Sequence, residues 1–378
     1  MGLFLTYALL LQPPAPALPA AKPVGTLEVV ATFAGPMPTG VAVSKAGRVF
    51  VNYPRWGDAV TFTVAEVKGN VATAYPDAAV SVYDKSKPAE TLVSVQSVVV
   101  DSADRLWMLD TGTVEFGPVT PGGAKLVGVD LATNKVVKSI PVPADVALPT
   151  TYLNDVRFDL TRGKAGVAYV TDSSTEGPNA IIVIDLDSGK CRRRLHEHPS
   201  TKADQGFLPI VEGQPLLERK PGQPVKSMSF GADGIAIAAD GKHLYYCPLS
   251  SRKLYRVATD ALLAEGDIDP KAVEDLGTRP FASDGMESDA QGRLYLTDYE
   301  HNAIQRRNAD GSYDTVACDP RMLWPDTLSV AADGYLYFTA NQLHRQKQFH
   351  NGKDLREKPY SVLRVKIDGT PVGSPQAR

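Results

Sequence analysis

The sequence predicts an all-β protein folded as a β-propeller of six blades. One β-hairpin pattern, in which apolar and polar residues alternate on both sides of a turn of the Asp/Gly type, occurs six times in the 378 residues. A hairpin repeated at this spacing indicates an array or a propeller. Further strand candidates follow most copies, and blades of about four strands arranged radially make a propeller.

The six hairpins align on their first polar residue. In chain order they run from Thr39 to Val51, Gln96 to Asp110, Asn154 to Asp172, Asp233 to Tyr246, Asp284 to Asp298 and Asp326 to Thr339. Aspartates inside the turns, such as Asp101 and Asp289, have the ordinary role of accepting hydrogen bonds from turn backbone. Six hairpins therefore predict six blades.

The two ends of the chain indicate how the ring of blades closes. Residues 360–367 are the third strand candidate of the last blade, and no fourth follows them. Residues 26–33 are a strand candidate with no hairpin before it. We expect 26–33 to be the outer strand of the last blade, because an open ring would expose two sheet edges. Residues 22–378 then form a single domain.

The composition is that of an ordinary globular protein, with 43% hydrophobic residues and a formal net charge of −3. A protein with this slightly negative net charge has no overall electrostatic attraction for nucleic acid, so no nucleic-acid partner is expected. No apolar stretch is long enough to cross a bilayer as a helix. No Ser-His-Asp or Cys-His constellation can be assembled, so catalytic residues stay unassigned.

Residues 1–21 resemble a secretory signal peptide. They contain an apolar core, Leu3–Leu11, and a small-residue site, Ala15-Pro-Ala17, although no Lys or Arg precedes the core. We therefore expect a secreted or periplasmic protein. No N-x-[ST] acceptor for glycosylation is present in the sequence, which favours a bacterial envelope over a glycosylating secretory route.

The cysteines predict neither a metal site nor a set of disulfides. Cys191, Cys247 and Cys318 are far apart and odd in number, and their spacing matches neither a metal site nor a set of disulfides. We expect them to be small buried side chains. Their disulfide state and the oligomeric state of the protein stay open.

The first polar residues of the six hairpins are the predicted site. Because the first strand of each blade lines the central channel, these residues are expected to form a ring at one mouth of the channel: Thr39, Gln96, Asn154, Asp233, Asp284 and Asp326. Converging carboxylates repel one another unless a cation, a cationic ligand or a proton lies among them. The alternative is structural, since Asp and Asn at strand starts commonly cap turns.

Two kinds of cation would fit such a ring. The amide of Asn154 and the carboxylates of Asp233 and Asp284 are hard oxygen ligands that suit calcium or another divalent ion. The same carboxylates, with Asp326, would instead attract a small cationic ligand. No cofactor is certain from the residues alone.

Blocks covering most of the chain resemble the major royal jelly protein/yellow family. The more specific blocks are PTGVAVSKAGRVFVNYPRW (38–56) and LWPDTLSVAADGYLYFTANQL (323–343). The resemblance implies a secreted six-bladed propeller that holds its ligand in the central channel. Insect members include dopachrome-converting proteins and salivary binders of biogenic amines, so the resemblance implies a small cationic or aromatic, amine-like ligand and a tautomerase-like activity. Arg55 and Asn341, within these blocks, join the predicted ligand-binding residues.

A fainter resemblance links the hairpins at Asn154, Asp233 and Asp284 to the metal-binding hairpins of regucalcin/gluconolactonase propellers. It implies the alternative function, a divalent-metal-dependent lactonase or hydrolase. The sequence departs from that pattern, because Asp233 stands where the family has Asn and Thr39 stands near the place of a first-blade Glu. A third interpretation is an envelope interaction protein with an inert channel.

Overall fold

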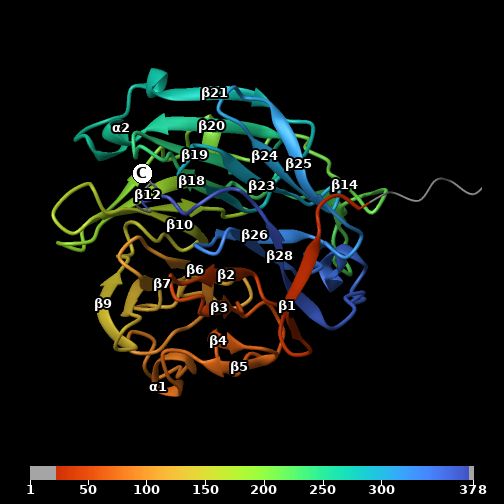
Figure 1. The fold of residues 1–378 in the computed structure, drawn as a ribbon, viewed down its shortest axis with the longest axis horizontal. Helices are drawn as coiled ribbons and strands as arrows, with labels where there is room; N and C mark the ends of the chain where they lie inside the picture. The colour runs from red at the N-terminus through yellow and green to blue at the C-terminus, as the bar shows by residue number, and fades with distance from the viewer. Residues whose placement is uncertain (1–22, 374–378) are drawn as a thin grey trace, which may run out of the picture.

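The computed structural model describes residues 23–373. Its main body is six four-stranded antiparallel sheets arranged radially around one axis (Figure 1). Blades 1 and 4 lie on opposite sides of this axis in Figure 1, and each runs from an innermost strand at the centre to an outer strand at the periphery. The predicted all-β, six-bladed propeller is confirmed.

In each blade the four strands follow one another from the axis outwards. Blade 1 is β2 (Gly40–Val43), β3 (Val49–Asn52), β4 (Val64–Lys68) and β5 (Val71–Ala74); blade 2 is β6 (Val95–Val100), β7 (Arg105–Asp110), β8 (Lys125–Asp130) and β9 (Lys135–Pro141); blade 3 is β10 (Leu153–Asp159), β11 (Val167–Asp172), β12 (Ala180–Asp185) and β13 (Cys191–Arg194). Blade 4 is β18 (Ala232–Ile237), β19 (His243–Pro248), β20 (Lys253–Ala258) and β21 (Val273–Thr278); blade 5 is β22 (Met286–Ser288), β23 (Leu294–Asp298), β24 (Ala303–Arg307) and β25 (Tyr313–Cys318); blade 6 is β26 (Pro325–Val330), β27 (Tyr335–Ala340), β28 (Tyr360–Lys366) and β1 (Leu27–Phe33).

The N-terminal strand β1 closes the ring as expected. It pairs antiparallel with β28 from Leu27 opposite Val365 to Phe33 opposite Tyr360. An ion pair of 2.6 Å between Arg364 and Glu28 reinforces this pairing. The last blade therefore combines strands from both ends of the chain and leaves β28 no free edge.

The core lies between neighbouring blades, where alternate side chains of facing sheets interdigitate. At the boundary of blades 2 and 3, Trp107 stacks on Phe158 with ring centroids 5.1 Å apart. At the boundary of blades 1 and 2, Phe50 packs into the same cluster as Val98 and Leu106. These contacts hold the blades rigidly around the channel and so fix the positions of the residues that line it.

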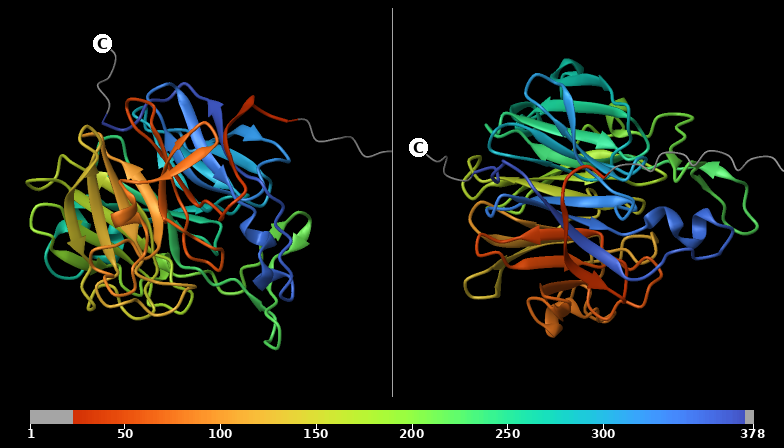
Figure 2. Two further views of the ribbon diagram at one scale, coloured as in Figure 1. Left: turned by 90° about the horizontal axis from the view of Figure 1, so that it is seen from below. Right: turned by 45° about the vertical axis from the view of Figure 1, so that its right-hand side comes forward.

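Two insertions pack together on one face of the disc. The first follows blade 3 and the second lies between β27 and β28; Figure 2 shows them side by side. Their elements are η1 (Pro199–Thr201), β14 (Ile210–Val211), β15 (Gln214–Pro215), β16 (Leu217–Glu218), β17 (Lys226–Ser227), η3 (Leu343–Arg345) and η4 (Lys347–Phe349). The N–H of Arg219 donates to the carbonyl of Gln348 at 2.7 Å, and Glu212 accepts from both His344 and Arg345. We call these two insertions the cap.

Helical structure is confined to short connections. Besides the turns of the cap, the described residues contain α1 (Ala78–Ser81), α2 (Thr259–Leu263) and η2 (Pro270–Ala272). None of the described helices is long and apolar enough to cross a membrane. All three cysteines are free in the structure; Cys247 is buried as expected, whereas Cys191 and Cys318 are only half-buried. The predicted signal peptide, residues 1–21, lies outside the described residues.

Candidate functional site

The six predicted ring residues lie together at the end of the channel beneath the cap. Thr39 donates its hydroxyl to the carbonyl of Gln96 at 3.3 Å, and Asn154 donates its amide to Oδ1 of Asp233 at 2.7 Å. All six side chains belong to residues that are at most 7% exposed. We call this group the acidic ring, and the end of the channel that holds it the ring end.

β-Bulges place four of the six ring residues. The register between the first and second strands shifts around Gln96, Asn154, Asp233 and Asp326, at the start of blades 2, 3, 4 and 6. A bulge adds an unpaired residue that bends the strand and turns its side chain away from the sheet face. The bulges therefore explain how a polar residue at the start of an otherwise apolar strand points towards the channel.

Two glycines allow the inner strands to approach each other at the ring. A Cβ on Gly234 would lie 2.3 Å from the carbonyl oxygen of Asp284, and a Cβ on Gly285 would lie 2.1 Å from that of Asp326. Both distances are far below a normal contact, so only glycine fits. In the Asp-Gly pairs of blades 4 and 5, the aspartate thus supplies a ring side chain, and the glycine leaves room for the backbone carbonyl of the next blade.

Each of the three carboxylates accepts a hydrogen bond from a neutral donor. Asp233 accepts from Asn154, Asp284 accepts from the indole of Trp324 at 2.7 Å, and Asp326 accepts from Asn341 at 2.6 Å. None of the described Lys, Arg or His side chains forms an ion pair with any of them. Three buried acidic groups thus lie together without a compensating positive charge.

The acidity of these groups reflects this crowding. Burial raises the pKa of Asp284 to about 6. Burial, together with the nearby Asp284 carboxylate, raises the pKa of Asp233 and of Asp326 well above the usual range. Desolvation and like charges both disfavour the ionised form, so the ring holds protons at a pH where ordinary aspartates are ionised.

An aromatic cluster flanks the ring on the side of blades 1 to 3. The indole of Trp56 stacks on Phe116 at 5.1 Å, and Phe116 packs on Tyr152 at 4.9 Å. The hydroxyl of Tyr152 accepts from Trp56 at 2.7 Å and donates to Gln96 at 3.0 Å. Phe116 is 45% exposed, so the cluster reaches from the ring to solvent.

A second aromatic stack lies on the opposite side, under the cap. Trp324 stacks on Tyr299 at 4.2 Å and lies parallel to His344 at 5.8 Å. The sequence-based prediction missed both aromatic groups. A signal was present, because Tyr152 and Trp324 each come two residues before a ring residue, Asn154 and Asp326.

The two other predicted residues have different surroundings. Asn341 is part of the site through its bond to Asp326. The guanidinium of Arg55 instead donates to the carbonyls of Val93 and Val60, at 2.8 and 2.7 Å, and thereby ties two loops together. The described contacts of the Arg55 side chain include none with the ring.

The donor set offers limited support for a metal. Residues 23–373 contain no cluster of three or more His, Cys, Asp or Glu side chains spaced to bind a metal ion. Of the predicted ligands, Asn154 turns its N–H towards Asp233, and Asp284 has one oxygen engaged by Trp324. Calcium usually takes about six to eight oxygen ligands, more than the side-chain oxygens that these three residues contain.

A model of the family described as "Major royal jelly protein" matches residues 93–374. The chain belongs to the major royal jelly protein family. It is 24% identical over 258 residues to major royal jelly protein 7 of Apis mellifera, covering 64% of this chain and 54% of that protein. It is 25% identical over 321 residues to the yellow-related salivary protein ASP2 of Phlebotomus orientalis, covering 79% and 77%. The chain thus spans about half the length of the royal jelly protein it matches.

This chain also shares its fold with solved propellers of other kinds. The gluconolactonase XC5397 of Xanthomonas campestris superposes with a TM-score of 0.55 at 13% identity, covering 94% of this chain and 99% of that one. The resemblances to both groups that the sequence suggested are confirmed. At this identity the second likeness shows the fold alone.

Proposed function

We propose that this member of the major royal jelly protein family binds a small cationic aromatic molecule, such as an aromatic amine, at the acidic ring. The observation that carries the proposal is the set of three buried carboxylates, Asp233, Asp284 and Asp326, which have no ion-pair partner among the described residues. Buried charge is normally paired. A bound ammonium group would supply the missing positive charge.

The aromatic groups on both sides of the ring support an aromatic ligand. Trp56, Phe116 and Tyr152 lie on one side, and Tyr299 and Trp324 lie on the other. Aromatic rings pack on one another in stacked or edge-to-face arrangements, and their faces also attract cations. The proposed ligand therefore places its ammonium group among the carboxylates and its ring against Phe116 and Tyr152.

The protonation of the ring also favours a tautomerase-like activity. Asp233 and Asp284 are adjacent, and their raised pKa values allow one to be protonated while the other is ionised. The ionised carboxylate would remove a proton from one atom of the ligand, and the protonated one would deliver a proton to another. The net result is an isomerisation that consumes no co-reactant. Conversion of dopaminechrome, the analogue of dopachrome without the carboxylate, followed by its absorbance, tests this step, and it should fail in Asp233→Asn.

The competing function is a calcium-dependent hydrolase that uses Asn154, Asp233 and Asp284 as ligands. Its support is the fold shared with gluconolactonase, whereas the hydrogen bonds to Asn154 and Trp324 favour the amine. Calorimetric titration of metal-free protein, first with Ca²⁺ and then with tyramine, separates the two. We expect heat with tyramine and none with Ca²⁺. If the protein binds Ca²⁺ and Asp284→Asn abolishes that binding, the metal-dependent function would be favoured over amine binding.

We also propose that the protein is exported, as a secreted or periplasmic protein of a bacterium. The support is the apolar core Leu3–Leu11 with its small-residue site, together with relatives named for royal jelly and saliva. Intact-mass measurement on protein from the native host should show that roughly the first twenty residues have been removed. A full-length chain in the cytosolic fraction would contradict export.

A further inference from the structure

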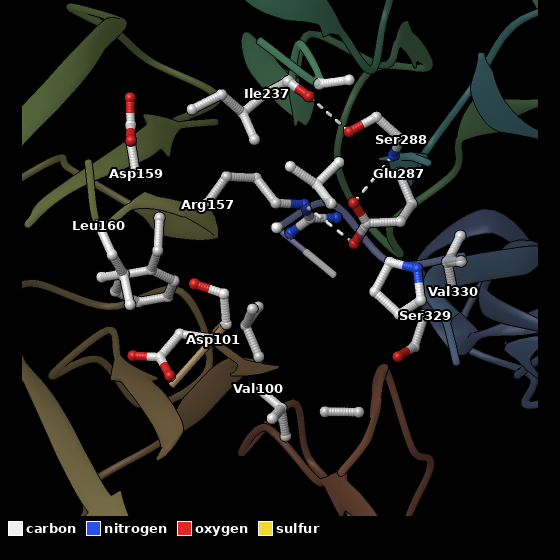
Figure 3. A pocket seen from close by; sticks show the side chains of 18 of the residues that line it. Val100, Asp101, Arg157, Asp159, Leu160, Ile237, Glu287, Ser288, Ser329 and Val330 are labelled. Carbon is white, nitrogen blue, oxygen red and sulfur yellow. Dashed lines mark hydrogen bonds and ion pairs between the residues drawn. The ribbon is translucent and has the colours of Figure 1, made fainter. Parts of the chain in front are cut away.

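A cavity of about 240 Å³ lies at the other end of the channel, where the hairpin turns of the inner strands gather. We call it the turn-end cavity (Figure 3). Its lining begins at Val41, Val98 and Arg157, which are two or three residues along their strands from the ring residues Thr39, Gln96 and Asn154. At about 3.3 Å per residue, its floor is roughly 7–10 Å from the acidic ring. It is therefore a separate site.

Arg157 and Glu287 form a charged pair in the lining of this cavity. Arg157 is 3% exposed and extends across the channel from blade 3 to blade 5, where it donates to the carbonyl of Met286. Its Nε lies 3.3 Å from Oε2 of Glu287, but has no hydrogen-bond partner among the described residues. The other oxygen, Oε1, accepts from the N–H of Ser288 at 2.9 Å. Figure 3 shows the two side chains meeting in the cavity.

A donor and an acceptor that form no hydrogen bond with each other therefore lie next to each other. The N–H at Arg157 Nε and the lone pairs of Glu287 Oε2 belong to an ion pair of opposite charges. Arg157 Nη1 also lies 3.8 Å from Oδ2 of Asp155, a carboxylate outside the cavity lining. A carboxylate ligand would be repelled by Glu287, and an ammonium ligand would be repelled by Arg157. A neutral group with one acceptor beside one donor satisfies both, and an amide has this arrangement.

The rest of the lining is mixed and partly covered. Its carboxylates include Asp101 and Asp159, which pair with Arg105 and Arg162 of their own hairpin turns. Val98, Val100, Leu328 and Val330 contribute its walls. The C-terminal segment, residues 371–373, forms an outer wall. Just before it, the carbonyl of Thr370 accepts from the N–H of Ala290 at 2.8 Å. In Figure 1 this segment runs from β28 across the disc towards blade 3. A dry cavity of roughly 150 Å³ already holds benzene, so this one has room for a ring and a polar head.

We propose that the turn-end cavity binds a small neutral molecule with an amide or lactam group on an apolar body. The carbonyl of the ligand accepts from Arg157, its N–H donates to Glu287, and its body packs against the valine and leucine walls. This site is distinct from the acidic ring, and the choice of its ligand does not rest on the function proposed there.

Three compounds with the same ring test the charge requirement: benzamide, benzoate and benzylamine. Calorimetry should show binding of benzamide to the wild-type protein and none of benzoate. Benzylamine should bind at the acidic ring only, so Asp284→Asn should remove its heat and leave benzamide binding unchanged. Benzoate binding as tightly as benzamide, or no benzamide binding at millimolar concentration, would overturn the proposal.

A blocking variant and a crystal soak locate the site. Ser329 lies in the cavity lining on β26, so Ser329→Phe should fill the cavity and weaken benzamide at least tenfold. Ser139→Phe, on the exposed outer strand β9, is the matched control and should change nothing. Anomalous scattering from soaked 4-bromobenzamide should place bromine in the turn-end cavity. Bromine found only elsewhere, or equal effects of the two variants, would contradict the assignment.

Discussion

Trp324 donates its indole N–H to Oδ2 of Asp284 across 2.7 Å, although the two residues are 40 positions apart in the sequence. The same indole belongs to the apolar cluster that holds the cap, where it is packed with Leu343 and Phe349. The position of a ring carboxylate is thus tied to the packing of the cap. A ligand that draws Asp284 towards itself must also act on this contact.

Asp284→Asn should abolish amine binding and stabilise the protein at neutral and alkaline pH. Because the pKa of Asp284 in the folded protein is about 6, the folded state favours the protonated carboxyl. The stability that this group contributes is complete below about pH 4 and is lost as the pH rises through 6. The loss in the free energy of unfolding is on the order of 3 kcal/mol. An asparagine still offers an acceptor to Trp324 but does not ionise, so the variant avoids this loss.

Urea unfolding at pH 4.5 and pH 8 measures this effect. The variant should exceed the wild type clearly at pH 8 and only slightly at pH 4.5. Asp240→Asn, in an exposed hairpin turn, is the control and should show the same small change at both pH values. A variant less stable than the wild type at pH 8 would mean that the ionised carboxylate has a partner in solution.

Amine affinity should rise with pH between 5 and 7. An aliphatic ammonium group stays protonated over this range, whereas Asp284 becomes ionised near pH 6. Since binding of a cation favours the ionised carboxylates, complex formation should release protons at pH 5. Calorimetry in two buffers of different ionisation enthalpy measures this release. An affinity independent of pH would argue against ligand contact with the ring carboxylates.

Phe116→Ala should weaken an aromatic amine selectively. The exposed ring of Phe116 lies between Trp56, on which it stacks, and Tyr152, against which it is tilted. Loss of one aromatic pair costs about 1 kcal/mol, so tyramine should bind about fivefold more weakly. Butylamine, which lacks a ring, is the matched ligand and should keep its affinity. Equal losses for both amines would mean that Phe116 acts on the shape of the site and not on the ligand ring.

Removal of β1 should strongly destabilise the fold. A chain starting at residue 34 loses the burial of Ala31 and Phe33 and leaves β28 with an open edge. Deletion of a buried phenylalanine side chain alone costs about 3–5 kcal/mol, and the strand contributes hydrogen bonds as well. A chain starting at residue 23 is the control. An unchanged melting temperature in the shorter chain would show that β1 does not close the ring in solution.

The sequence predicted the blades and the ring because both follow from local pattern. Each hairpin carries its own alternation and turn, and each ring residue occupies the same place in its repeat. The bulges around Asn154 and Asp233 could not be predicted from the sequence, because a bulge is defined only by the register with the partner strand. Their effect was anticipated only because the hairpins were aligned on the first polar residue.

Contacts between segments far apart in the sequence could not be predicted from the local pattern of residues. The insertion after blade 3 has the Pro and Gly content of a loop. Its sequence does not predict the hydrogen bonds of Arg219 with Gln348 and of Glu212 with His344. The charge pair of Arg157 and Glu287 was missed for the same reason. Each residue looks like an ordinary strand residue until the propeller brings the inner strands of blades 3 and 5 to the same channel.

The pairing of β1 with β28 also sets an order of events in biosynthesis. The first strand to be made has no partner until residue 366, near the end of the chain, has been added. Five blades can form while the chain is being synthesised, but the sixth cannot be completed before its third strand exists. Until then, β1 is an unpaired strand open to wrong partners. A chain that stays unfolded until it is complete, as a chain exported before folding does, avoids that interval.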